Sequence, residues 1–184
     1  KGEGRNNYTG FELHGKTIGI IGMGRIGKEV ARLCNAFGCT VLAWNRTMKK
    51  VTDVQFVALE YLLKKSDIVS LHVPLTPQTN GMISQEQFSL MKPTAIIINT
   101  ARGPVIDSAA LAQALNNQLI AGAALDVYDY EPPLLPDYQL INLKNTLLLP
   151  HIAYTTHEAF ELRANIVFEN IFKWKENIEM SKML

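Results

Sequence analysis

Short apolar runs rich in β-branched residues alternate along the chain with stretches whose apolar residues recur every three or four positions. The runs cover residues 17–21, 40–44, 67–73, 95–99, 119–126 and 146–149, and the helical stretches cover 26–37, 56–65, 108–116 and 156–179. Runs that are apolar on both faces and are separated by amphipathic helices are typical of a parallel sheet covered on both sides. The pattern therefore predicts an α/β fold, a doubly wound parallel sheet in three α/β/α layers.

Composition excludes several other classes of protein. The chain has 184 residues, 47% of them hydrophobic and 19% charged, which excludes a disordered chain and suggests one domain or at most two. A net charge of +1 gives no electrostatic case for nucleic acid or an acidic membrane surface. No apolar stretch approaches the roughly 20 residues of a membrane-spanning helix, and the polar N-terminus lacks a secretory apolar region. We therefore expect a soluble, cytoplasmic protein.

The two cysteines and the few histidines give no sign of a metal site. Cys34 falls within a helical stretch and Cys39 just before an apolar run, and no clustered histidines accompany them. We expect two thiols in a reducing compartment and no metal.

The strongest local motif is a glycine-rich turn. Gly22, Gly24 and Gly27 form a G-x-G-x-x-G pattern that directly follows the run 17–21 and opens the helical stretch 26–37. In this context the first glycine permits a tight turn, the second lets a pyrophosphate approach the backbone, and the third lets the helix pack on the strand. A turn that binds nothing is the alternative. The context favours a Rossmann-type dinucleotide site, with the pyrophosphate at the helix N-terminus.

The end of the second run bears on the choice of cofactor. A site for NAD usually has Asp or Glu here, about 20 residues after the glycines. This chain instead has Asn45, followed by Arg46 and Thr47. Asn45 can bind a ribose hydroxyl without repelling a 2′-phosphate, and Arg46 can bind that phosphate through a charge-assisted fork, although it can equally be a solvated loop residue. The sequence modestly favours NADP over NAD.

Three residues beyond the ends of later runs could take part in acid–base chemistry. Arg102 follows the run 95–99, Glu131 lies on the proline-containing loop 130–140, and His151 follows the last run. Each alone is ordinarily a surface or structural residue. Ligands bind beyond the carboxyl ends of the strands of an open parallel sheet, and a cation, a carboxylate and an imidazole together at that edge fit hydride transfer to a 2-oxo acid.

The chain resembles the nucleotide-binding domain of the D-isomer-specific 2-hydroxyacid dehydrogenases, from about residue 13 to about residue 178. The matching blocks are residues 15–27, 71–79, 98–103, 124–132 and 150–153, in family order and spacing. The resemblance implies that Arg102 binds the substrate carboxylate, that His151 donates the proton, and that Glu131 orients His151. We also expect the following residues to contact the cofactor: Gly22, Gly24, Arg25, Ile26, Gly27, Asn45, Arg46, Thr47, His72, Val73, Pro74, Thr79, Thr100, Ala101, Asp126 and Ala153.

The resemblance also implies what the rest of the protein does. The family's substrate domain is built mainly from residues that precede the cofactor domain, so we interpret residues 1–184 as a dinucleotide-binding domain that by itself turns over little or no substrate. The implied substrates are small 2-oxo or D-2-hydroxy acids, such as glyoxylate, hydroxypyruvate or phosphoglycerate-like acids, and the implied assembly is a homodimer. Two alternatives remain: a nucleotide-sensing corepressor built on the same domain and, with less support, a methyltransferase.

Overall fold

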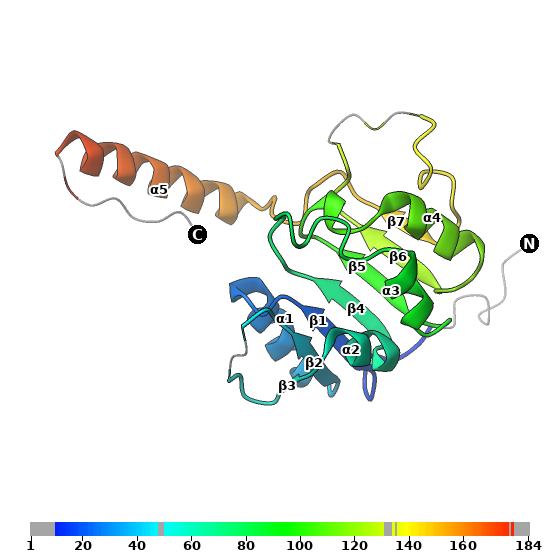
Figure 1. The fold of residues 1–184 in the computed structure, drawn as a ribbon. Helices are drawn as coiled ribbons and strands as arrows, with labels where there is room; N and C mark the ends of the chain where they lie inside the picture. Colours follow the sequence, from blue (N-terminus) through cyan, green and yellow to red (C-terminus); the bar gives the residue numbers. More distant parts are fainter. Residues whose placement is uncertain (1–9, 48–49, 131–133, 135, 177, 179–184) are drawn as a thin grey trace, which may run out of the picture. The chain divides into compact units, whose positions relative to one another are not determined.

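The computed structural model describes residues 10–47, 50–130, 134, 136–176 and 178. The described residues up to Pro150 form one compact unit, and the described residues from His151 onward form a second. In the first unit, seven parallel strands form one sheet in the order β3-β2-β1-β4-β5-β6-β7 (Figure 1). The strands are β1 (Thr17–Ile21), β2 (Thr40–Trp44), β3 (Gln55–Phe56), β4 (Ile68–Leu71), β5 (Ile96–Asn99), β6 (Gly122–Leu125) and β7 (Thr146–Leu148). The helices of this unit are α1 (Arg25–Ala36), α2 (Leu59–Lys65), α3 (Gln85–Leu90) and α4 (Ser108–Asn116), together with the 3-10 helix Gly103–Val105.

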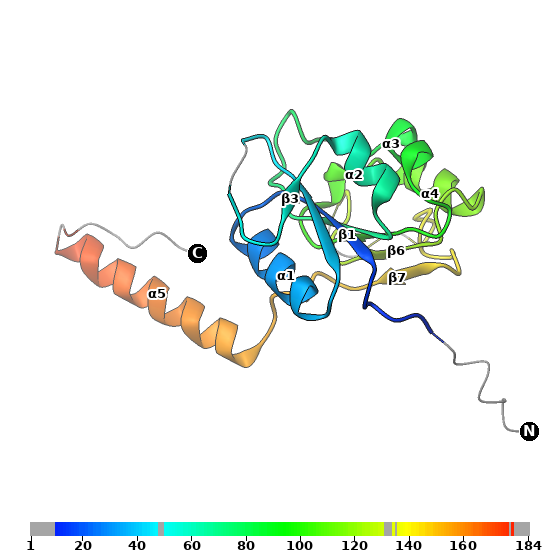
Figure 2. The same cartoon turned by 90° about the horizontal axis from the view of Figure 1, so that it is seen from below.

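Helices cover both faces of the sheet. α1 lies on one face, and α2, α3 and α4 lie on the other (Figure 2). Two apolar cores follow from this arrangement: Ile18 and Ile20 belong to the core on the α1 side, whereas Leu62 of α2 belongs to the larger core on the opposite side. The three-layer Rossmann-type fold expected from the sequence is confirmed.

The α1 face is incompletely covered toward β7. The register pairs Ile18 of β1 with Ile68 and Ile68 with Ile96, so these side chains share the face that α1 covers at β1. Ile96 is nevertheless 39% exposed, and Leu147 of β7 is 58% exposed. The sequence pattern indicated strands buried on both faces, and within this unit that holds fully only for the strands near the centre of the sheet.

The order of the strands reverses at β1, and this reversal determines where a ligand can bind. β1 pairs with β2 on one side and with β4 on the other. The connections that leave β1 and β4 at their carboxyl ends therefore diverge, which opens a crevice between them. This is the edge at which the glycine turn lies.

The sequence pattern missed two short elements. β3 has only two residues and α3 only six, so neither shows a detectable period, and Phe56 belongs to β3 rather than to the start of α2. α3 is instead defined by its capping box, in which Ser84 and Gln87 exchange hydrogen bonds. Such a cap stabilises the start of a helix without any periodic pattern of apolar residues, so the pattern did not reveal α3.

The second unit contains one long helix, α5 (His157–Lys175). The Ala159 N–H donates a 3.0 Å hydrogen bond to the Thr156 hydroxyl, so Thr156 caps the N-terminus of this helix. No residue of α5 is buried. Over the described part of the chain, no helix has the length and apolarity needed to cross a bilayer, and no three His, Cys, Asp or Glu side chains gather closely enough to hold a metal ion.

Candidate functional site

The turn between β1 and α1 can form only with glycine at position 22. Gly22 has a φ of +101°, and its N–H donates a 2.9 Å hydrogen bond to the Trp44 carbonyl at the end of β2. A Cβ atom on Gly22 would lie 2.6 Å from the carbonyl oxygen of His72, which follows β4. The turn therefore brings the carboxyl ends of β1, β2 and β4 close together, and a side chain would force them apart.

The N-terminus of α1 has the properties of an anion-binding site. Its first N–H groups have no side-chain cap, and its first turn contains no acidic residue. A Cβ atom on Gly24, the N-cap, would meet nothing within 4 Å, so the space in front of these N–H groups is open. A Cβ atom on Gly27 would instead overlap the Gly22 carbonyl oxygen, which shows that this glycine sets the approach of helix to strand. These residues fit a dinucleotide pyrophosphate.

Asn45 connects the glycine turn to the end of β2. Its Oδ1 accepts the Met23 N–H at 3.0 Å, and its Nδ2 donates to the Thr47 carbonyl at 2.7 Å. The amide is thus already engaged at both ends, and one N–H and one lone pair are left for a ribose hydroxyl. Asn45 accordingly has a second role, holding the turn in place, that spacing alone did not indicate.

Two neighbouring hollows lie at this edge of the sheet and share His72, Val73 and Pro74. The first, of about 370 Å³, is bounded by Gly24 and by the segment after β2, and the second, of about 450 Å³, is bounded by Ile26 and by the segment after β5. Among the predicted cofactor residues, those lining one or both hollows are Gly24, Ile26, Asn45, Arg46, Thr47, His72, Val73, Pro74, Thr79, Thr100 and Ala101. Arg102 also lines the second hollow. Residues from four separate loops thus line these two adjoining hollows.

His72 lies in the wall between the two hollows. Its Nε2 is 2.9 Å from the Ser70 hydroxyl, and burial lowers the pKa of the imidazole. The ring is therefore held in its neutral form near pH 7, as a hydrogen-bonding group without a positive charge.

Arg102 is exposed on a turn that a buried asparagine holds in place. Asn99, 1% exposed at the end of β5, accepts the Ala101 N–H at 3.0 Å and donates to the Arg102 carbonyl at 2.9 Å. The Arg102 guanidinium donates to the Ala101 carbonyl at 2.6 Å. Sequence reasoning included Asn99 in a family block but assigned it no role. The available signal was an amide at the end of an otherwise aliphatic run, directly before a turn.

The remaining predicted residues lie apart from these hollows or outside the described part. Gly22 and Gly27 are buried in the turn, Arg25 is exposed at the start of α1, and Asp126 is 2% exposed at the end of β6. Glu131 lies outside the described residues. His151 and Ala153 belong to the second unit.

Within the second unit, His151 has an unusual backbone. Its φ is +55°, and its ring packs edge-on against that of Tyr154, with 5.6 Å between the ring centroids. A residue other than glycine in the left-handed region is uncommon, and such residues often lie at functional sites. Asp53 and Gln118 of the first unit also have positive φ values, so the conformation does not by itself assign a role to His151.

Comparison with known proteins identifies the family. The model of the D-isomer-specific 2-hydroxyacid dehydrogenase NAD-binding domain matches residues 1–153. The chain belongs to this family. A glyoxylate reductase of Korarchaeum cryptofilum is 46% identical over 170 residues, which cover 90% of this chain and 51% of the relative. This chain thus spans about half the length of the relative that it matches.

Solved structures agree with this assignment. The TT0316 protein of Thermus thermophilus superposes with a TM-score of 0.91 at 41% identity, over 97% of this chain and 57% of that one. An acyclic imino acid reductase in complex with NADPH and D-Arg superposes with a TM-score of 0.89 at 37% identity, over 99% of this chain and 58% of that one. The family resemblance expected from the five sequence blocks is confirmed, and so is a domain that binds a nicotinamide dinucleotide.

Proposed function

We propose that the chain is the cofactor-binding half of an NAD(P)H-dependent reductase of small 2-oxo acids, which also runs in reverse on D-2-hydroxy acids. One observation carries the proposal: Ile26, in the first turn of the helix that follows the glycine turn, and Arg102 line the same hollow. A cation able to fork onto a carboxylate thus shares a hollow with the dinucleotide turn. The relative's name, glyoxylate reductase, supports glyoxylate as the first acid to test, with hydroxypyruvate and phosphoglycerate-like acids next.

The proposed roles follow from the chemistry of the side chains. When bound, the dinucleotide supplies the hydride that reduces the 2-oxo carbon. Arg102 holds the substrate carboxylate, and its positive charge also stabilises the negative charge that develops on the 2-oxo oxygen. His151 gives that oxygen a proton and takes it back in the oxidation direction. Glu131 hydrogen-bonds His151 and so orients its ring. The uncapped N-terminus of α1 binds the pyrophosphate.

Turnover by the complete polypeptide that contains this chain tests the proposal. We expect NADPH-dependent reduction of glyoxylate that saturates with substrate, whereas residues 1–184 alone bind NADPH and show little or no turnover. Binding of NADPH by the complete polypeptide with no activity on any of a panel of 2-oxo acids would contradict an enzyme and support the corepressor-type alternative.

The proposal extends to cofactor preference, with NADPH favoured modestly over NADH. No carboxylate stands at the end of β2 to repel a 2′-phosphate, and Arg46 and Thr47 line the first hollow. We expect Arg46→Ala to weaken NADPH binding about 5–30-fold, because an exposed charge-assisted hydrogen bond is lost, and to change NADH binding less than about twofold. Fluorescence titration with both cofactors measures the effect. Lys64→Ala, which removes an exposed cation from α2, serves as the control, and equal losses for both cofactors in Arg46→Ala would contradict the assignment.

Two further parts of the proposal concern the whole protein. We propose a homodimer in the cytoplasm, with small 2-oxo and 2-hydroxy acids as its ligands. The exposed apolar side chains of α5, among them Phe168 (61%) and Trp174 (70%), support association of the helix with another surface.

A further inference from the structure

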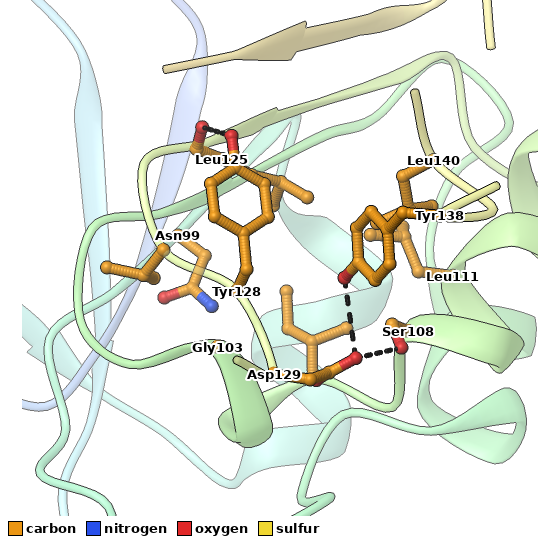
Figure 3. Close-up of a pocket in the computed structure, with 11 residues that line it drawn as sticks. Asn99, Gly103, Ser108, Leu111, Leu125, Tyr128, Asp129, Tyr138 and Leu140 are labelled. Carbon is orange, nitrogen blue, oxygen red and sulfur yellow. Dashed lines mark hydrogen bonds between the residues drawn. The ribbon is translucent and has the colours of Figure 1, made fainter. Parts of the chain in front are cut away.

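The loop after β6 is packed against the turn that carries Arg102. Tyr128 is 8% exposed, and its backbone carbonyl abuts Gly103 so closely that a Cβ atom on Gly103 would overlap it. Figure 3 shows Gly103 beside this loop, with the ring of Tyr128 standing above it. The cavity among these residues is only about 10 Å³, too small for a ligand. The region is therefore a packed junction between two loops and not a binding pocket.

The hydroxyl of Tyr128 reaches a third segment. It lies 2.8 Å from the carbonyl oxygen of Leu149 and 3.3 Å from that of Leu125. A phenol has one proton to donate, so the shorter bond to Leu149 is the stronger one. The Leu149 N–H donates to the same Leu125 carbonyl at 2.9 Å. The hydrogen bond from Tyr128 thus holds the backbone at Leu149, directly after the edge strand β7.

Only Pro150 lies between His151 and Leu149, whose carbonyl accepts the hydrogen bond from Tyr128. Proline fixes its own φ and restricts the residue before it, so backbone rotation at Leu149 and about the N–Cα bond of Pro150 is limited. His151 itself adopts a φ of +55°. Holding the Leu149 carbonyl therefore constrains the backbone that leads to His151.

We propose that Tyr128 is a positioning residue for proton transfer, because it links the turn that carries Arg102 to Leu149, the residue from which the chain continues through Pro150 to His151. Its backbone abuts the Arg102 turn at Gly103, and its hydroxyl donates to the carbonyl of Leu149, two residues before His151 in the sequence. The proposal rests on the function proposed above. Because a misplacement of about 1 Å can cost about 100-fold in rate, one hydrogen bond at this junction can matter for turnover.

A neighbouring tyrosine provides a matched control. Tyr138 is also 8% exposed, and its ring packs edge-on against that of Tyr128 with 6.0 Å between the ring centroids. Burial, the largest cause, and the nearby Asp129 carboxylate raise the pKa of Tyr138 to about 12, so the phenol keeps its proton. Its hydroxyl lies 3.3 Å from Asp129 Oδ2, which also accepts the hydroxyl of Ser108 (Figure 3). Tyr138 thus has the same chemistry and burial but does not hold Leu149.

The test compares Tyr128→Phe with Tyr138→Phe in the complete polypeptide. For Tyr128→Phe we expect kcat for glyoxylate to fall about 5–50-fold, while KM and the Kd for NADPH change less than twofold, because the ring and the cofactor residues stay in place. For Tyr138→Phe we expect kcat within twofold of the wild type. Thermal unfolding of both variants measures any purely structural effect.

Each other outcome overturns the proposal. Equal losses of kcat in the two variants would show general loosening of the aromatic cluster, and loss of NADPH binding in Tyr128→Phe would show a structural role. A wild-type polypeptide that reduces no 2-oxo acid removes the proposed function itself, whereas an active wild type with an unchanged Tyr128→Phe variant removes only the role of Tyr128.

Discussion

His151→Asn is expected to lower kcat for glyoxylate about 100–10,000-fold, the range that general acid catalysis contributes. Asparagine is the suitable replacement because His151 has a φ of +55°, and asparagine tolerates the left-handed region better than most residues. The variant therefore removes the proton donor with little backbone strain. The Kd for NADPH should change less than about threefold, since the residues proposed to contact the cofactor, apart from Ala153, lie in the first unit. Stopped-flow oxidation of NADPH measures the rate, and equilibrium titration measures the affinity.

His157→Asn is the matched control for this experiment. His157 is an exposed histidine at the first position of α5, in the same unit as His151, and we assign it no role in the reaction. We expect wild-type kcat for this variant. A loss of less than tenfold in His151→Asn, or an equal loss in His157→Asn, would show that the proton comes from another group.

Two glycines of the same turn are expected to respond to alanine in opposite ways. Gly27→Ala places a methyl group against the Gly22 carbonyl oxygen, so we expect overpacking to lower the free energy of unfolding by about 1–3 kcal/mol or more. Gly24→Ala meets only open space, and its φ of −79° suits alanine, so we expect only the smaller loss of about 0.5–1 kcal/mol that follows from alanine being a poorer N-cap than glycine. The new methyl group instead occupies space proposed for the pyrophosphate. We therefore expect NADPH affinity to fall about 10–100-fold, comparable to losing a hydrogen bond to a charged group.

Urea unfolding and NADPH titration of both variants separate the two effects. Gly10→Ala, at a described position where a Cβ atom also meets nothing within 4 Å, should change neither quantity. Unaltered NADPH affinity in Gly24→Ala would place the pyrophosphate elsewhere, and unaltered stability in Gly27→Ala would mean that α1 can move away from β1 at little cost.

The sequence predicted the helices and strands that have a periodic apolar pattern, and the parts of the site that are made by residues close together in the chain. β1 and β2 have the predicted bounds because each is a largely buried apolar run, and the glycine turn follows from three residues at fixed spacing. β3 was missed because two residues carry no period. Asn99 was given no role because its function depends on bonds to Ala101 and Arg102 that only the folded turn creates. The grouping of Arg102 with His151 stays a prediction, since the two residues belong to separate units.

The all-parallel sheet has a consequence for how the chain acquires its fold. Parallel neighbours cannot be joined by a hairpin, so each pairing must wait for a crossover connection to close. The Thr17 N–H at the start of β1 donates to a carboxylate oxygen of Asp67, which lies 50 residues later. At ribosomal rates of about 5–20 residues per second, that partner emerges about 2.5–10 s after Thr17. During this interval β1, an apolar strand, lacks its neighbour β4, and the backbone N–H and C=O groups on that edge are unpaired. We therefore expect slower translation to place a greater demand on the chaperones that shield this edge.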